Sequence, residues 1–385
     1  MDFELSGAQR AIRDAIRDFG TREVKPHAEE WDREERFPAE TVRRLGEAGF
    51  LGMTLPREVG GGGADTLGGA LVVEGIARYD ASLGLTVASH TSLASGHINL
   101  FAGETLRRRY LPRLANGEWL GAWCLTEPAS GSDAAGLRTR AVRDGESWVL
   151  NGAKMFITQG SVGHVYVVLA ATSPALGQKG ISAFVVERGT PGLSTGRKIE
   201  KLGLRASDTA EVILENVRIP GGNLIGEVDQ GFKQALRVLD VGRIGIAAWC
   251  CGIARGALED SLAYVRERTA SDRPLAEPRA VQFLLADMAT RLEAARVLLY
   301  RAAHLKEAGR PFRTEASIAK LTASEAAMWI TTKAVQIHGS HGCRRDCAVE
   351  RYMRDAKLGE IGEGTSEVQR LVIARALLSG APLGL

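Results

Sequence analysis

The chain has 385 residues, enough for two or three domains that share a large core. Hydrophobic residues make up 45% of the chain and charged residues 25%, the composition of an ordinary globular protein. The formal net charge of +3 is too small to indicate attraction to nucleic acid, and no apolar run approaches the roughly 18 residues that cross a bilayer. We therefore expect neither nucleic-acid binding nor membrane insertion, and look for function in local sites.

The amino-terminal stretch is charged from its second residue and does not resemble an export signal or transit peptide. The five cysteines have neither a paired framework nor CxxC spacing, which suits a reducing compartment: Cys124, Cys250, Cys251, Cys343 and Cys347. We expect a cytoplasmic protein, although a mature organelle protein would have the same features.

Residues 1–118 have a helical pattern. Ser6 and Gln9 have the spacing of a capping box, and further helices are predicted over 68–88 and 103–115. Four consecutive glycines, 60–63, suggest a phosphate-binding loop only weakly, because a preceding strand and the GK[ST] ending are missing.

Residues 119–228 predict an all-β domain, because β-branched runs alternate there with glycine and polar turns. Strands are expected in VYVVLAAT, ISAFVVERG and TAEVILENVRI. Asn151-Gly152 lies between two apolar runs and predicts a hairpin turn.

Residues 229–385 are helical again, with two long apolar-striped stretches that begin near Phe232 and Glu315. Successive striped helices favour a bundle that buries its faces mutually. The expected architecture is a multidomain α+β protein with an N-terminal all-α domain, a middle β-barrel or β-sandwich domain and a C-terminal four-helix bundle.

Two segments mix special backbone residues with polar groups. Residues 123–136, WCLTEPASGSDAAG, form a turn-rich loop whose N–H groups and hydroxyls could bind a heterocycle or a phosphate. A solvated connection between domains explains the same composition equally well.

The second segment is IGEGTSEVQR, where Glu363 lies between two glycines just before a predicted helix. We expect Ser366 to be the N-cap, with Gln369 completing a capping box and with Val368, Leu371 and Val372 in a buried stripe. Taken alone, an acidic residue before a helix is more commonly a solvated loop residue beside a favourable helix dipole.

Seven motifs occur along the chain: CLTEPASGSDAAG, FIT at 156–158, LDVGRIGIA, YVRER, QIHG, VERYMRDAK and EGTSEVQRLVIARALL. Together they resemble the flavin-dependent acyl-CoA dehydrogenase family over essentially the whole chain. The resemblance implies a three-domain fold, FAD as cofactor, a homo-oligomer that is commonly a tetramer, and an electron-transferring flavoprotein as electron acceptor. It also implies that the chain oxidises the Cα–Cβ bond of an acyl-CoA to the trans-2-enoyl-CoA, most closely like short-chain and branched-chain bacterial members.

By this resemblance Glu363 is the base that removes the α-proton, its backbone N–H binds the thioester oxygen, and the β-hydrogen leaves as hydride to flavin N5. Burial should raise the pKa of its carboxyl, against the opposing effect of the helix N-terminus. The flanking glycines would give the acyl chain and that N–H room.

The resemblance assigns further residues to ligands. FAD contacts are implied for Trp123, Leu125, Thr126, Ser132, Phe156, Ile157, Thr158, Thr365 and Glu367, with Arg268, Gln336 and Gly339 reaching the FAD of a neighbouring subunit. Substrate contacts are implied for Ser132, Asp240, Arg243 and Gly364, although an ion pair between helices would also explain Asp240 and Arg243.

The sequence departs from the common family pattern at Gly362, Ser271, Arg279 and Ser340. Gly362 replaces an aromatic wall of the acyl pocket, and the other three changes put the adenosine contacts in doubt. Gly242 occupies the position from which some members supply their base, which leaves Glu363 as the one candidate at either position.

No metal site is expected: His338 and His341 lack a third ligand, and His90 and His97 are given no catalytic role. Other possibilities remain open. The same fold could act on an acyl-carrier-protein thioester, a nitroalkane or a dicarboxylyl-CoA, or it could be a non-catalytic acyl-CoA-binding scaffold.

Overall fold

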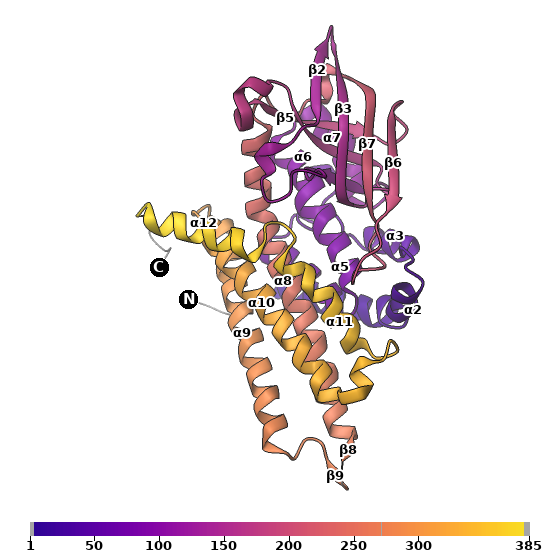
Figure 1. The fold of residues 1–385 in the computed structure, drawn as a ribbon, viewed down its shortest axis with the longest axis vertical. Helices are drawn as coiled ribbons and strands as arrows, with labels where there is room; N and C mark the ends of the chain where they lie inside the picture. Colours follow the sequence, from indigo (N-terminus) through magenta and orange to yellow (C-terminus); the bar gives the residue numbers. More distant parts are fainter. Residues whose placement is uncertain (1–3, 271, 381–385) are drawn as a thin grey trace.

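A computed structural model describes residues 4–270 and 272–380; the departure at Ser271 lies outside them. The chain forms a helical part, a curled sheet and a second helical part, in the order that the sequence predicts (Figure 1). The sheet stands at one end of the long helices, and the small β8–β9 ribbon (Thr269–Ala270 and Arg273–Pro274) lies at the other end.

The N-terminal part contains α1 to α7. Their bounds are Gly7–Phe19, Ala28–Arg33, Ala39–Glu47, Thr66–Ala77, Ala81–Ala88, Gly96–Phe101 and Glu104–Ala115. The predicted capping box is confirmed, since Gln9 N donates to Ser6 Oγ and Ser6 N donates to Gln9 Oε1. The helix expected over 68–88 is two helices, α4 and α5, because Asp80 accepts a hydrogen bond from Leu83 N and starts a new helix.

The glycine-rich loop is a folded turn. The N–H groups of Gly61, Gly62 and Gly63 donate to the carbonyls of Pro56, Gly52 and Leu55 at 2.9–3.0 Å. These groups are satisfied within the protein, so the weak phosphate hypothesis receives no support from them.

Within the described residues the middle part is one seven-stranded sheet in the order β1-β4-β2-β3-β7-β6, with β5 paired to β4. The strands β1 to β7 are Gly121–Cys124, Arg140–Asp144, Ser147–Thr158, Val165–Ala171, Ile181–Glu187, Leu193–Lys198 and Thr209–Pro220. The three strands expected from β-branched runs are β4, β5 and β7.

The hairpin predicted at Asn151-Gly152 is wrong. Both residues lie inside β3, and the turn that joins β2 to β3 falls at 145–146, where Asp144 pairs with Ser147. Pairing of β3 with both β2 and β7 overrides the local turn preference, and a register shift against β7 between Leu150 and Gly152 absorbs the irregularity. Gly152 also passes so close to Thr139 that an added Cβ would lie 2.8 Å from its Cα.

The C-terminal part contains α8 to α12, with bounds Gly231–Glu267, Arg279–Glu307, Arg313–His338, Ala348–Ala356 and Ser366–Leu378. Both long helices expected from the sequence are present as α8 and α10. The final helix, α12, projects from the bundle (Figure 1), and its Leu371 is 53% exposed, so the buried stripe predicted there is wrong in the single chain.

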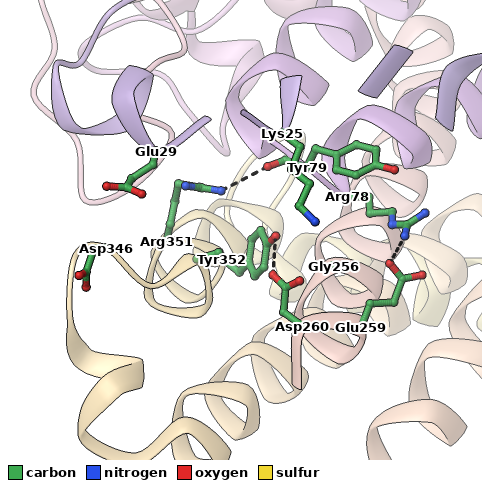
Figure 2. Close-up of a pocket in the computed structure, with 11 residues that line it drawn as sticks. Lys25, Glu29, Arg78, Tyr79, Gly256, Glu259, Asp260, Asp346, Arg351 and Tyr352 are labelled. Atoms are coloured by element: carbon green, nitrogen blue, oxygen red, sulfur yellow. Dashed lines mark hydrogen bonds and ion pairs between the residues drawn. The ribbon is translucent and has the colours of Figure 1, made fainter. Parts of the chain in front are cut away.

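One ion pair and two hydrogen bonds connect the N-terminal part, α8 and α11 around a cavity of about 160 Å³ (Figure 2). Arg78 pairs with Glu259, Tyr352 donates to Asp260 at 3.1 Å, and Arg351 donates to the carbonyl of Tyr79. These contacts fix the N-terminal part on α8, the helix that also positions the site described next.

Candidate active site

Glu363 lies in the loop between the 3₁₀ turn Lys357–Glu360 and α12. Its φ of 51° and that of Gly364 at 93° put two consecutive residues in the left-handed region, an unfavourable conformation for a glutamate that is characteristic of functional sites. Among the described residues its backbone N–H donates to no acceptor, whereas the preceding N–H groups of Ile361 and Gly362 both donate to Leu358. The strained turn therefore presents a free N–H.

The start of α12 differs from the prediction by one residue. Thr365 is the N-cap, with its hydroxyl accepting from Val368 N at 3.3 Å, and Ser366 is already helical. Gln369 does not complete a capping box; its side-chain amide donates to the carbonyls of Glu363 and Gly364. Gln369 thus braces the turn that carries Glu363.

The Glu363 carboxylate points into the protein. Its Oε2 atom is buried and accepts no hydrogen bond from the described residues. The carboxylate packs on α8 at Gly242, where an added Cβ would lie 3.1 Å from Glu363 Cδ and 3.1 Å from Leu93 Cδ2. Because Gly242 has no side chain, α8 leaves room for the Glu363 carboxylate at this position.

Burial raises the pKa of Glu363 to about 7, and the positive charges of Lys320 and Arg243 oppose that rise. The upward direction agrees with the expectation, and the charges that oppose it belong to two side chains. A carboxyl group with a pKa near 7 is partly ionised at neutral pH and is also a stronger base than an ordinary carboxylate, so it is suited to abstract a proton.

The loop after β1 lies against the end of β3. Met155 N donates to Thr126 O at 2.9 Å, and Lys154 Nζ donates to Leu125 O at 3.2 Å and to Glu127 Oε1 at 2.8 Å. Glu127 also accepts from the N–H groups of Arg138 and Thr139. A fully buried lysine and a buried glutamate therefore hold this loop in place, which argues against a merely solvated linker.

Phe156 lies at the end of β3 and has unusual geometry. Its φ is 57°, and its side chain is 61% exposed, while the adjacent Ile157 is 1% exposed. An outward-facing aromatic ring on strained backbone, beside the Leu125–Thr126 loop, is a surface on which a planar ring can stack.

Trp123 is connected to α8 through His97. The indole N–H donates to His97 Nδ1 at 3.0 Å, which makes His97 Nε2 the donor to Gln234 Oε1, also at 3.0 Å. Burial lowers the pKa of His97 to about 4, so the ring is neutral at physiological pH. Gln234 precedes Gly242 by eight residues, which is about 12 Å along a helix; α8 thus sets the spacing between the Trp123 loop and Glu363.

Asp240 pairs with Arg243 within α8 at 2.7 Å and with Arg313 of α10 at 3.5 Å, so an ion pair between helices is present as well. Arg243 is almost fully buried and also contacts Ser317 of α10 at 3.3 Å. Asp240 and Arg243 both lie within one helical turn of Gly242. The positive charge of Arg243 opposes the rise in the pKa of Glu363.

The remaining expected residues lie elsewhere in the single chain. Arg268, Gln336 and Gly339 are exposed at the β8–β9 end of the bundle, and Arg268 follows Gly242 by 26 residues, about 39 Å of helix. Ser132, Glu367 and the divergent Arg279 and Ser340 are also exposed. A single chain therefore does not bring Arg268, Gln336 and Gly339 together with the residues around Glu363.

The histidines have structural surroundings. His338 stacks on Tyr264 with ring centroids 4.2 Å apart, and His90 accepts from Gly121 N while bonding to Leu114 O. Within residues 4–270 and 272–380 no group of three His, Cys, Asp or Glu side chains could hold a metal ion, and no helix could span a membrane.

Sequence reasoning missed Lys320, Lys154 and the bracing role of Gln369. Both lysines are fully buried. A lysine inside an apolar stripe, as in SIAKLTASEAA, was the available signal.

Comparison with known proteins identifies the family. The acyl-CoA dehydrogenase N-terminal, middle and C-terminal domain models match residues 6–118, 122–217 and 229–378. The short-chain specific acyl-CoA dehydrogenase of Clostridium acetobutylicum is 45% identical over 97% of this chain and 99% of that protein.

Solved structures agree. Butyryl-CoA dehydrogenase from Megasphaera elsdenii is 41% identical with a TM-score of 0.97, covering 98% of this chain and all of that one. A chain from work on the electron transferring flavoprotein of Acidaminococcus fermentans is 44% identical with a TM-score of 0.97 over the same shares. The chain belongs to the acyl-CoA dehydrogenase family. It is an FAD-dependent oxidoreductase that dehydrogenates acyl-CoA thioesters.

Proposed function

We propose that Glu363 is the catalytic base and that the substrate is a short-chain acyl-CoA. The observation that carries the proposal is the buried, unpartnered Oε2 of Glu363 beside an unpaired backbone N–H. FAD, when bound, accepts the β-hydrogen as hydride. Phe156, Trp123, Leu125, Thr126, Ile157 and Thr158 would hold its ring, with the exposed ring of Phe156 as the stacking surface.

The chain's own residues perform the proton transfer. The ionised Glu363 takes the α-proton of the thioester, and negative charge develops on the thioester oxygen. The N–H of Glu363 donates to that oxygen, and one well-placed donor of this kind is worth about 10²–10³ in rate. Base and oxyanion donor thus come from one residue, which the left-handed φ turns toward the same substrate.

The acyl tail would enter a cavity of about 270 Å³ whose lining includes Val241, the neighbour of Gly242 in α8. Val241, Ile244 and Gly245 line it from α8, and Ser92 and Leu100 line it from the N-terminal part. Part of its wall is polar, since Lys306 Nζ donates to Thr66 Oγ1 at 2.9 Å and Thr66 donates to Glu307 at 2.9 Å. A long apolar tail would desolvate these polar groups, which supports a short chain, in agreement with the relatives' names.

We propose an electron-transferring flavoprotein as the electron acceptor and a tetramer in which Arg268, Gln336 and Gly339 complete the FAD site of a neighbour. Exposed apolar side chains support assembly, among them Leu371 and Leu377 on α12 and Phe283 on α9. Sedimentation of the purified protein would test the tetramer. Five free cysteines support the cytoplasm as its location.

The test is anaerobic mixing of the FAD-loaded protein with straight-chain acyl-CoA thioesters of increasing length, with flavin absorbance followed. We expect fast loss of the oxidised-flavin band with short chains and a falling rate as the chain lengthens. A rate that rises with tail length would refute the short-chain proposal, and no response to any thioester would refute the function.

A further inference from the structure

Lys320 is a fully buried lysine in α10 whose position is unusual for a cation. Its Nζ donates to the carbonyl oxygen of Gly364 at 2.7 Å, directly after Glu363 in the chain. Within the described residues no carboxylate lies within ion-pair distance of this ammonium. Burying such a charge without a paired carboxylate is costly, so its retention calls for a physical reason.

The charged and titratable groups around Lys320 come from three elements. Glu363 is in the loop before α12, Arg243 and Cys250 are on α8, and Glu360 is in the preceding 3₁₀ turn. Burial lowers the pKa of the Lys320 ammonium, Arg243 lowers it further, and Cys250, Glu363 and Glu360 oppose that fall. Asp240 pairs with Arg243 and adds a negative charge to this group.

Two donors converge on the turn. Lys320 Nζ and Gln369 Nε2 both donate to Gly364 O, at 2.7 and 2.8 Å, and Gln369 also reaches Glu363 O at 3.3 Å. Hydrogen bonds from α10 and α12 hold the carbonyl groups of Glu363 and Gly364, so the backbone of these two residues cannot rotate freely. The left-handed φ values of 51° and 93° are thereby maintained, and the Glu363 N–H keeps its direction.

We propose that Lys320 is a positioning residue: it fixes the Glu363–Gly364 turn, and its positive charge favours the ionised form of the Glu363 carboxylate. The inference rests on the proposed role of Glu363 as base. Its two parts are separable, because the hydrogen bond to Gly364 needs only a donor, whereas the effect on Glu363 needs a positive charge.

Three variants separate the parts. Lys320→Arg keeps the charge and a donor, Lys320→Gln keeps a donor without the charge, and Lys320→Met removes both. Lys333→Met is the matched control, since Lys333 lies on the same helix 13 residues away, about 20 Å. The readout is the rate of flavin reduction by a saturating acyl-CoA in anaerobic stopped flow across pH, on protein with full FAD content.

In the Lys320→Gln enzyme we expect the acid limb of the pH profile to move up by about one unit or more, since an opposite charge at close range lowers a carboxyl pKa by that much. At pH below the limb this is a tenfold slower reaction, and at high pH the rate should return toward that of the wild type. Lys320→Arg should keep the wild-type limb, and Lys320→Met should in addition be slow at every pH because the turn loosens.

An unmoved acid limb in folded, FAD-loaded Lys320→Gln enzyme would overturn the proposal and leave Lys320 a packing residue. If Lys320→Met does not fold, Lys320→Gln alone decides. Glu363→Gln distinguishes this failure from failure of the proposed function: if that variant still reduces flavin at the normal rate, Glu363 is not the base. If it is inactive while the limb in Lys320→Gln stays fixed, only the role of Lys320 is refuted.

Discussion

Replacing Gly242 by alanine perturbs the site by a single methyl group. The new Cβ would lie within van der Waals overlap of the Glu363 carboxylate and 3.1 Å from Leu93 Cδ2. The carboxylate ends a flexible side chain, so it would yield by about 1 Å, and a displacement of that size costs about 10²-fold in rate. Alanine is also favoured over glycine inside a helix by about 0.5–1 kcal/mol, so unfolding should not become easier.

The assay compares kcat/KM for a short acyl-CoA, FAD content and thermal unfolding of Gly242→Ala with those of the wild type. Gly7→Ala is the control, because an added Cβ there meets nothing within 4 Å. We expect about a hundredfold loss of kcat/KM in Gly242→Ala with FAD and stability retained. Wild-type activity in the variant would refute the claim that Gly242 makes room for the base.

Three further predictions concern the base, the loop and the ring surface. Because burial raises the pKa of Glu363 to about 7, kcat/KM should fall as pH drops through 7 and the base becomes protonated; an acid limb near 4.5, the ordinary value, would contradict this. Lys154→Met leaves Glu127 buried without its partner and should lower the free energy of unfolding by about 3–5 kcal/mol in urea, with part recovered in the Lys154→Met/Glu127→Gln double variant. Phe156→Gly should weaken FAD binding, measured by flavin fluorescence, without lowering stability, because glycine relieves about 1 kcal/mol or more of strain at φ 57°; unchanged FAD affinity would refute the stacking role.

Much of the fold could be predicted from local patterns. The period of apolar residues changes at the domain borders, which is why the helical, β, helical order and the long helices α8 and α10 were recognisable. Asn151-Gly152 failed because β3 is paired on both sides, a non-local fact that outweighs a dipeptide's turn preference. The N-cap of α12 is Thr365 and not the predicted Ser366, because the left-handed turn at Glu363 and Gly364 fixes where the helix can begin.

The sequence motifs were enough to predict the candidate base and the candidate FAD-binding loop, but not the buried lysines that hold them in place. Glu363 and the loop after Trp123 could be named from motifs, but the depth of Lys320 and Lys154 depends on how helices and strands pack around them. The exposure of Leu371 on α12 and the position of Arg268 at the far end of α8 depend on how the helices pack in three dimensions, which local sequence patterns do not state.

Glu363→Gln tests the central claim most directly, because glutamine keeps the shape and the backbone N–H but cannot take a proton. The FAD-loaded variant, mixed anaerobically with a short acyl-CoA, should still bind the thioester, seen as a shift of the flavin spectrum. Its flavin should remain oxidised, with the reduction rate lowered by at least about 10²–10⁴. Reduction at the wild-type rate would contradict the assignment of Glu363 as the base.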